Sequence, residues 1–280
     1  STHMRLGFMT VRDMRALPFE EVAQWGADNG FEAVDAQIDQ IDTCATCGIE
    51  VGATHLLPDV LVLDDAAREA AQREACAAID EAVARGVRRA MIAHARTPGM
   101  STEESIEIFA RGYAPVAEYA EQFEFKLVME IYHAHGRWLA ITPESIRAVF
   151  AAVPSRSLGI CLDPSHLVVQ GIDYIRATKE FGDRIFYAHA KDTEVFADKL
   201  YDYGVFGRAL GNDRPFAGWW RYRLPGYGSI NWAQFIATLN EVGYDDILAI
   251  EHEDEIYYGS PERNKKGLLM AKKYLEQFIV

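Results

Sequence analysis

The strongest constraint on the fold is a regular alternation of short apolar runs with longer amphipathic segments, repeated eight times along the 280 residues. Short runs rich in β-branched residues predict buried strands, and the amphipathic segments predict helices. Buried parallel strands joined by crossover helices are the expected product. We predict strands at Arg5–Thr10, Ala33–Ala36, Glu50–Thr54, Arg89–Ala93, Lys126–Ile131, Leu158–Leu162, Ile185–Ala190 and Ile247–Glu251. We predict helices at Phe19–Asn29, Ile38–Cys44, Ala66–Arg85, Thr102–Gln122, Pro143–Ala152, Asp173–Phe181, Trp232–Val242 and Pro261–Phe278.

Eight strand–helix units in a chain of this length fit a (β/α)8 barrel, whose typical size is roughly 250 residues. The alternative α/β fold is an open doubly wound sheet, which usually carries a glycine-rich phosphate loop after its first strand. Here Val11-Arg12-Asp13-Met14 follows that strand, so no such loop is present. We therefore predict an α/β protein with a single (β/α)8 TIM barrel over residues 4–280. We expect residues 1–3, which precede Met4, to be left over from cloning.

Composition and charge exclude several classes of protein. The formal net charge is −14, which repels a polyanion, so we expect no nucleic-acid partner. No apolar run approaches the roughly 20 residues of a membrane span, and no export signal is visible, so we expect a cytoplasmic protein without a membrane partner. The pair Cys44 and Cys47 has CxxC spacing but no second pair of ligands, so we expect reduced thiols.

One connection, residues 193–229, breaks the rhythm because it shows no clear helical period and is rich in aromatic residues and arginines. It follows the seventh strand, on the face of a barrel where active sites lie. Long loops of this kind are usually lids, binding loops or interface elements, and the alternative is a structural cover over an apolar patch. We predict that Trp219, Arg221 and Arg223 in this loop contact the substrate.

The last four predicted strands each end in a side chain that can bind a metal ion: Glu130, Asp163, His189 and Glu251. An ionised carboxylate after an apolar run is costly unless a cation neutralises it. Alone, each residue is more often a helix cap, a salt bridge or a core residue, but all four at the same end of successive strands are hard to explain that way. In a barrel these ends converge, so we predict one shared metal site. Three carboxylates and one imidazole suit Mn²⁺, Mg²⁺ or Co²⁺ better than Zn²⁺.

Further polar residues follow the same strand ends and form a second layer around the predicted metal site. His166 comes three residues after Asp163, and Lys191 comes two residues after His189. Such groups orient ligands, bind hydroxyls or transfer protons. We predict that His166, Lys191 and His133 contact the substrate. The other members of this layer, each with a structural role as the alternative, are Asp192, Glu253, His55 and His94.

An ordered set of short segments in the C-terminal half resembles a known family. The segments are Met129-Glu130, Asp163-Pro164-Ser165-His166-Leu167, His189-Ala190-Lys191-Asp192-Thr193, Pro225-Gly226-Tyr227-Gly228 with Trp232, and Ile250-Glu251-His252-Glu253. They resemble the sugar-phosphate isomerase/epimerase group of the xylose isomerase-like barrels. Relatives include ketose 3-epimerases, hydroxypyruvate isomerase and inosose dehydratase.

The resemblance implies a metal quartet of Glu130, Asp163, His189 and Glu251, and an acid/base pair of Glu130 and Glu251 on opposite faces of the substrate. It also implies a catalytic contact between His166 and the substrate. The arginine that some epimerases carry after the metal-binding histidine has no counterpart in Thr193-Glu194-Val195-Phe196. Segments around Asp163–Tyr174 and Trp219–Arg223 look closer to the catalytic subunits of C-glycoside-cleaving enzymes, which use a small β-rich partner subunit.

The sequence therefore predicts a metal-dependent isomerase or epimerase of a sugar or keto-sugar, with Mn²⁺ as the expected cofactor. A carboxylate would remove a proton next to a carbonyl, through a metal-stabilised enediolate. One alternative is a lyase or dehydratase that eliminates a leaving group from a 3-oxo sugar or glycoside. Others are an apurinic endonuclease with zinc, which the acidic surface disfavours, and a metal-free sugar-binding or scaffold protein. The expected partners are a small sugar or an oxidised glycoside, with a homo-oligomer or a small partner subunit as further assemblies.

Overall fold

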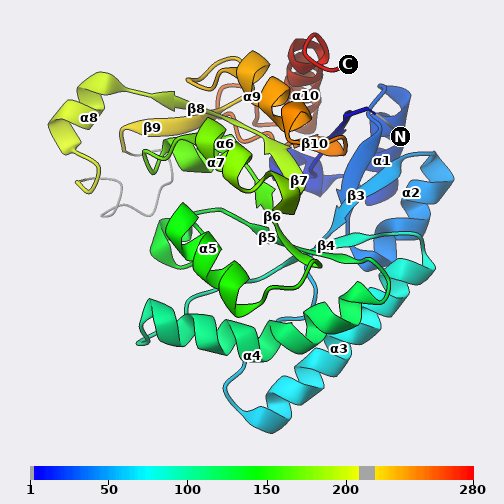
Figure 1. The fold of residues 1–280 in the computed structure, drawn as a ribbon. Coiled ribbons are helices and arrows are strands. Elements are labelled where there is room, and N and C mark those ends of the chain that lie inside the picture. The colour runs from blue at the N-terminus through cyan, green and yellow to red at the C-terminus, as the bar shows by residue number, and fades with distance from the viewer. Residues whose placement is uncertain (1–2, 208–217) are drawn as a thin grey trace.

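Eight parallel strands close into a barrel in the computed structural model, which describes residues 3–207 and 218–280 (Figure 1). Their order around the barrel is β1-β10-β7-β6-β5-β4-β3-β2. The predicted fold class is thus confirmed, and each predicted barrel strand begins where the structure places it. The strands are β1 Arg5–Phe8, β2 Ala33–Ala36, β3 Glu50–Thr54, β4 Arg89–Ile92, β5 Lys126–Glu130, β6 Leu158–Leu162, β7 Ile185–Ala190 and β10 Ile247–Ile250. Residues 1 and 2 of the expected cloning remnant lie outside the described residues, as do residues 208–217 of the predicted loop.

Helices surround the barrel, and two of them begin at the capping residues that the sequence indicates. Ser101 accepts a hydrogen bond from the Glu104 amide, and Thr142 accepts one from the Ser145 amide. The helix predicted at 38–44 is divided in the structure. A 3₁₀ turn covers Ile38–Gln40, and the α-helix α2 begins at Ile41. The helices around the barrel are α1 Phe19–Asp28, α2 Ile41–Cys47, α3 Asp65–Ala84, α4 Thr102–Glu121, α5 Pro143–Ala152, α6 Pro164–Val168, α7 Tyr174–Glu180, α9 Trp232–Glu241 and α10 Pro261–Glu276.

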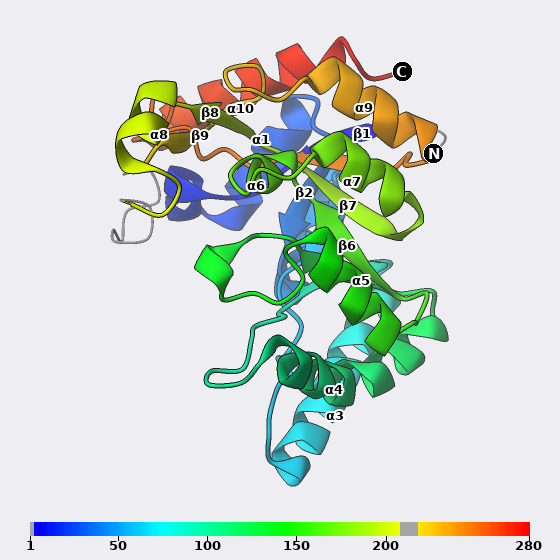
Figure 2. The same cartoon turned by 60° about the vertical axis from the view of Figure 1, so that its left-hand side comes forward.

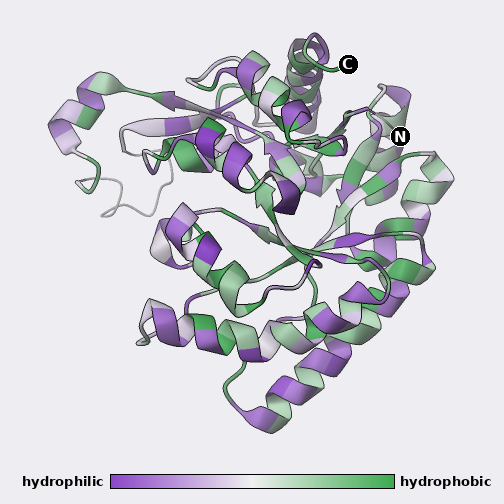
Figure 3. Ribbon diagram, viewed as in Figure 1, coloured by the Kyte–Doolittle hydropathy of each residue, from purple (hydrophilic) through white to green (hydrophobic). Residues whose placement is uncertain are grey.

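The hydrophobic core has two parts, one between the strands and the helices and a smaller one inside the barrel. Figure 3 shows hydrophobic residues along strands such as β6, and alternating hydrophilic and hydrophobic residues along α3. The interior cluster includes Met91, Val128, Phe186 and Tyr187. The barrel is therefore a packed core rather than a pore. The polar side chains of interest lie at the carboxyl ends of its strands, which we call the open end.

The opposite end of the barrel is closed by a buried arginine. Arg89 on β4 donates hydrogen bonds to the carbonyl oxygens of Gly52 and Phe186, at 2.7 and 2.9 Å. It also forms an ion pair of 2.8 Å with Asp246, which in turn contacts Arg5 at 3.1 Å. These contacts satisfy the buried guanidinium, which would otherwise be costly to desolvate.

The segment expected to be an irregular loop, residues 193–229, contains regular structure. Strands β8 (Asp192–Val195) and β9 (Trp220–Arg223) pair antiparallel, and α8 (Ala197–Tyr203) lies between them along the chain. Figures 1 and 2 show that this arm projects from the barrel with α8 at its far end. The expectation was wrong because the strands are only four residues long and their pattern is masked by the density of aromatic residues.

The return of the arm to the barrel is fixed by Asp192, a buried carboxylate. It accepts hydrogen bonds from the amides of Gly226 and Ile230, at 3.0 and 3.1 Å, and from the indole Nε1 of Trp232, at 2.8 Å. Asp192 therefore has a structural role in the motif that it shares with His189 and Lys191.

None of the helices formed by the described residues is both long enough and apolar enough to cross a membrane. Cys44 and Cys47 are free thiols on α2, with Cys44 buried in the core.

Candidate metal centre and active site

Four side chains meet at the open end of the barrel, one from each of β5, β6, β7 and β10 or the residue that directly follows. One ligand atom from each of Glu130, Asp163, His189 and Glu251 lies within 4.8 Å of all the others. Nδ1 of His189 is 3.5 Å from Glu130 Oε1, 4.0 Å from Asp163 Oδ2 and 3.2 Å from Glu251 Oε2. The structure thus brings the four predicted metal ligands together. Parallel strands in register explain this, because Glu130 pairs with Cys161 and Ala249 pairs with His189.

Asp163 is oriented by the helix that it caps. Its Oδ1 accepts hydrogen bonds from the Ser165 amide and hydroxyl, at 3.0 and 2.7 Å, and Pro164 occupies the first position of α6. Its Oδ2 is left pointing at the cluster, and burial raises the pKa of this carboxyl to about 6. One oxygen of Asp163, Oδ1, therefore caps the helix, while the other, Oδ2, remains available to the cluster.

Several buried polar atoms of this site have no hydrogen-bond partner among the residues that the structure describes. They are Asp163 Oδ2, both ring nitrogens of His189, and Nε2 of His166. Buried polar atoms are nearly always satisfied in folded proteins, so a cluster of exceptions calls for a missing partner. A divalent cation fits, because it would bond to carboxylate oxygens and an imidazole nitrogen at the same point.

Lys191 is a fully buried ammonium beside the quartet. Its Nζ contacts Glu251, lies 3.2 Å from Glu253 Oε1 and 3.7 Å from Asp163 Oδ2. Burial alone would lower the pKa of Lys191, but Glu251 and Glu253 raise it well above its ordinary value. In return, Lys191 holds the pKa of Glu251 well below its usual range, against the effect of burial. Lys191 therefore lies beside the quartet, as the sequence predicts.

One wall of the site is built from imidazole and phenol rings. The hydroxyl of Tyr222 lies 2.9 Å from His166 Nδ1 and 3.3 Å from His133 Nε2. His166 Nε2 is 3.3 Å from Asp163 Oδ2 and 3.8 Å from Glu130 Oε1. Burial lowers the pKa of His133 to about 4 and that of His166 well below its ordinary value, so both rings are neutral near pH 7. His133 and His166 thus lie beside the quartet, as expected.

The three residues predicted in the arm lie elsewhere. Arg221 pairs with Glu194 at 3.0 Å and with Glu255 at 2.8 Å. Arg223 pairs with Glu194 and Asp254, each at 2.8 Å, and Trp219 is buried in a cluster with Trp220 and Tyr222. No contact of these three residues with the quartet is found in the described part of the chain, and acidic neighbours on the arm and after β10 engage the two guanidinium groups. Substrate contact by them stays a prediction.

Sequence reasoning did not include Tyr222, Asp35 and Tyr187 among the site residues. Tyr222 reaches the site from a strand more than 30 residues beyond His189, and only its place in the aromatic segment drew attention to it. Asp35 is the last residue but one of β2 and bonds to His55 and to the hydroxyl of Tyr187. Its position at a strand end was the available signal. The structural alternative applies to His94, whose ring bonds to the Glu130 carbonyl at 2.6 Å and to the Ala140 amide at 3.1 Å.

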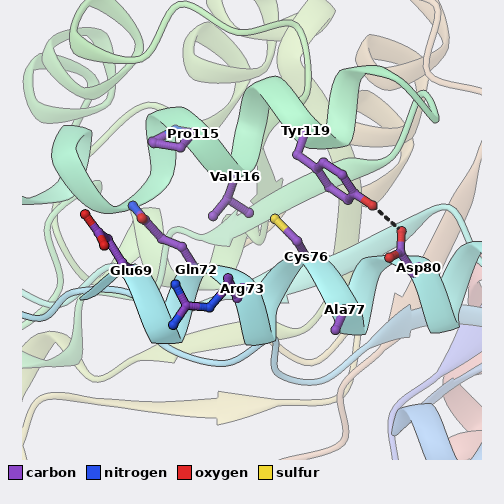
Figure 4. A pocket seen from close by; sticks show the side chains of 9 residues that line it. All are labelled: Glu69, Gln72, Arg73, Cys76, Ala77, Asp80, Pro115, Val116 and Tyr119. Atoms are coloured by element: carbon purple, nitrogen blue, oxygen red, sulfur yellow. Dashed lines mark hydrogen bonds between the residues drawn. The ribbon is translucent and has the colours of Figure 1, made fainter. Parts of the chain in front are cut away.

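A separate hollow of about 440 Å³ lies on the outer surface between α3 and α4 (Figure 4). None of the quartet residues lines it. The phenol of Tyr119 donates a 2.5 Å hydrogen bond to Asp80 across it, and the lone thiol of Cys76 faces it. No cluster of metal-binding groups converges there among its lining residues, so the open end of the barrel is the candidate site.

Comparison with known proteins places the chain in a family. The model of the family described as "Xylose isomerase-like TIM barrel" matches residues 7–274. An inosose dehydratase of Clostridium perfringens is 25% identical over 182 residues, which cover 62% of this chain and 55% of that protein. The chain spans about half the length of the curated relatives that it matches.

Solved structures share the same barrel. The IOLI protein, whose structure holds a zinc atom, superposes with a TM-score of 0.76 at 17% identity, covering 98% of this chain and 99% of that one. A D-psicose 3-epimerase of Clostridium cellulolyticum, solved with D-tagatose, gives 0.74 at 13% identity, with coverage of 98% and 99%. At these identities the likeness shows the fold alone. Because the family model covers nearly the whole chain, the protein belongs to the xylose isomerase-like TIM barrel family.

Proposed function

We propose that this protein is a divalent-metal-dependent isomerase or epimerase of a sugar or keto-sugar, with Mn²⁺ as the preferred ion. One observation carries the proposal: four ligand atoms converge within 4.8 Å, and Asp163 and His189 contribute atoms without a hydrogen-bond partner among the described residues. Three oxygen donors and one nitrogen donor form a hard site, which favours Mn²⁺ or Mg²⁺ over Zn²⁺. A D-psicose 3-epimerase among the solved structures has the same barrel, so this fold can house chemistry of the proposed class.

The quartet would hold the ion, which when bound supplies Lewis-acid stabilisation of negative charge on substrate oxygens. Glu251, kept ionised by Lys191, is suited to take a proton from the carbon next to a carbonyl. Glu130, whose side chain is 29% exposed, faces the mouth, where it can take up a proton from solvent and deliver it to the same or the neighbouring carbon. Neutral His166, bonded to Tyr222, and the ammonium of Lys191 can each position a substrate hydroxyl.

Deuterium incorporation tests this proposal. We expect the Mn²⁺-loaded protein in deuterated water to exchange a carbon-bound proton next to the carbonyl in a panel of ketohexoses, read by NMR. Glu130→Gln and Glu251→Gln keep each side chain's shape but remove its basicity. Each should reduce exchange by about 10²-fold or more, the usual size of general acid–base catalysis.

The matched control is Glu69→Gln, an exposed carboxylate in the outer hollow between α3 and α4. It should exchange at the wild-type rate. Circular dichroism melting of all variants separates loss of chemistry from loss of fold. Full exchange by either quartet variant, or by protein stripped of metal with a chelator, would refute the proposal.

A second candidate is a lyase or dehydratase that acts on a 3-oxo sugar or glycoside. It is favoured by the inosose dehydratase among the sequence relatives. It shares the first proton removal, but the bond to a β-substituent then breaks and the electron pair leaves with that group. Release of the aglycone from a 3-oxo-glycoside, with no interconversion of free ketoses, would replace the leading proposal by this one.

A further inference from the structure

A second cavity opens at the same end of the barrel, over the ends of β1, β2 and β3. Its volume is about 420 Å³, within the range of roughly 300–1,000 Å³ of pockets that hold small ligands. No quartet residue lines it. Its lining includes Met9, Arg15, Leu17, Phe19, Asp35 and His55.

The cavity and the quartet are joined by a chain of contacts through the barrel interior. The hydroxyl of Tyr187 donates a hydrogen bond to Asp35, and its ring centroid lies 5.6 Å from that of His189. Gly52 leaves room for this contact, since a Cβ there would lie 2.1 Å from the Tyr187 hydroxyl oxygen. The cavity is therefore the neighbouring half of the same mouth.

A buried carboxylate holds one polar side chain at the cavity wall. Asp35 is 4% exposed, and its Oδ2 lies 2.7 Å from Nε2 of His55, which is 29% exposed. Burial acts to lower the pKa of His55, but Asp35 outweighs it and the pKa is raised. None of the described residues forms a hydrogen bond with the other ring nitrogen, Nδ1. Because Asp35 holds the imidazole at Nε2, the ring orientation is fixed and Nδ1 remains available to a ligand.

The rest of the lining is divided between apolar and hydrogen-bonding groups. Met9, Leu17 and Phe19 supply apolar surface. Arg15 and Gln40 supply N–H donors, and Gln40 Oε1 is already engaged by the Gln37 amide at 2.9 Å. A sugar ring has this combination of surfaces, since its C–H groups pack on apolar side chains while its hydroxyls accept hydrogen bonds.

We propose that this cavity is a subsite for a second, hydroxylated ring of a glycosidic substrate, and that His55, positioned by Asp35, recognises that ring while the keto-sugar unit lies at the quartet. The inference rests on the proposed function, because it places the reacting unit at the metal site. It narrows the substrate class from free monosaccharides to sugars that carry a glycosyl group. His55 acts here as a binding residue and Asp35 as a positioning residue.

Isothermal titration calorimetry of the Mn²⁺-loaded protein tests the subsite with three probes: D-fructose, its 4-O-glucosyl derivative maltulose, and D-fructose 6-phosphate. We expect maltulose to bind at least tenfold more tightly than D-fructose. His55→Ala and Arg15→Ala, on different elements, should each reduce that ratio towards one. Arg73→Ala, an exposed arginine in the outer hollow, is the matched control and should keep the wild-type ratio.

Equal affinity for D-fructose and maltulose overturns the subsite, and so does binding of neither sugar. Selective binding of D-fructose 6-phosphate overturns it in favour of an anion site. Unchanged ratios in both cavity variants, with melting temperatures like that of the wild type, also contradict the role of His55. Mn²⁺ binding and deuterium exchange on D-fructose are measured separately, so failure of the subsite is distinguishable from failure of the proposed function.

Discussion

Lys191 Nζ lies 3.7 Å from Asp163 Oδ2, so a buried ammonium stands against a carboxylate that also belongs to the metal quartet. Two cations in one cluster compete for the same negative charge. The attraction between unit charges 4 Å apart is about 4 kcal/mol at an effective dielectric constant of 20. Lys191 therefore both supports the metal-free cluster and opposes an incoming ion.

The first prediction concerns this competition. Lys191→Met should lower the Kd for Mn²⁺ at least tenfold, because it removes a repelling charge. The same change should destabilise the metal-free protein by about 3–5 kcal/mol, the usual cost of breaking a buried ion pair. Titration calorimetry gives the Kd, and urea unfolding in the presence of a chelator gives the stability. Weaker Mn²⁺ binding in the variant would show that Lys191 organises the ligands rather than opposing the ion.

Metal binding should stabilise the fold. The carboxylates of Glu130, Asp163 and Glu251 repel one another without an ion, and an ion that binds only the folded state adds stability by mass action. At a free Mn²⁺ concentration 100 times the Kd, the gain should be about 2.7 kcal/mol, measured as a rise in Tm by calorimetry. The double variant Asp163→Asn/His189→Gln should show no such rise. An equal rise in that variant would place the ion elsewhere.

Tyr222→Phe isolates the contribution of the arm to the site. The change removes the hydroxyl that bonds to His166 and His133 but keeps the ring. A lost hydrogen bond of this kind is worth about 0.5–1.5 kcal/mol, so kcat/KM should fall by roughly twofold to thirteenfold. The Kd for Mn²⁺ should stay within twofold of wild type. Tyr201→Phe on α8, where the side chain is 89% exposed, is the control and should change neither value. An unaltered kcat/KM in Tyr222→Phe would show that the arm contributes nothing to catalysis through this hydroxyl.

Acid stability should depend on Asp246 at the closed end of the barrel. Burial would raise the pKa of this carboxyl, but Arg89 lowers it below its ordinary value. A carboxyl with a depressed folded pKa contributes stability above its unfolded pKa, about 3.9, and loses that contribution as pH falls through the folded pKa. Asp246→Asn should therefore cost about 3–5 kcal/mol at pH 7 and clearly less at pH 3, measured by urea unfolding. Asp65→Asn, an 84% exposed carboxylate paired with Arg68, should cost under about 1 kcal/mol at both. An equal loss at pH 7 and pH 3 in Asp246→Asn would contradict this assignment.

The barrel and the quartet were predictable because both depend on local patterns. Buried strands read as apolar runs, and a polar residue such as Asp163 at the end of one is conspicuous against them. Parallel register then fixes which ends meet, without further information from side chains. The helix caps at Ser101 and Thr142 were equally local, and the helices begin where those residues indicate.

The arm and the second half of the mouth were not predictable, because both depend on pairings distant in sequence. Tyr222 meets His133 across 89 positions, and Tyr187 meets Asp35 across 152. Arg223 was expected to face a ligand, yet Glu194 and Asp254 engage it, and no local pattern distinguishes those two outcomes. Charged residues on a short strand can pair with any neighbour that the fold provides.

The arm is tied to the barrel at its base, by the hydrogen bonds to Asp192 and the ion pair of Arg223 with Asp254, while α8 stands at the far end. Substitutions in α8 should therefore leave the position of the Tyr222 side chain unchanged. Such an arrangement gives protein engineers a place to graft a new recognition element beside the barrel without rebuilding the barrel itself.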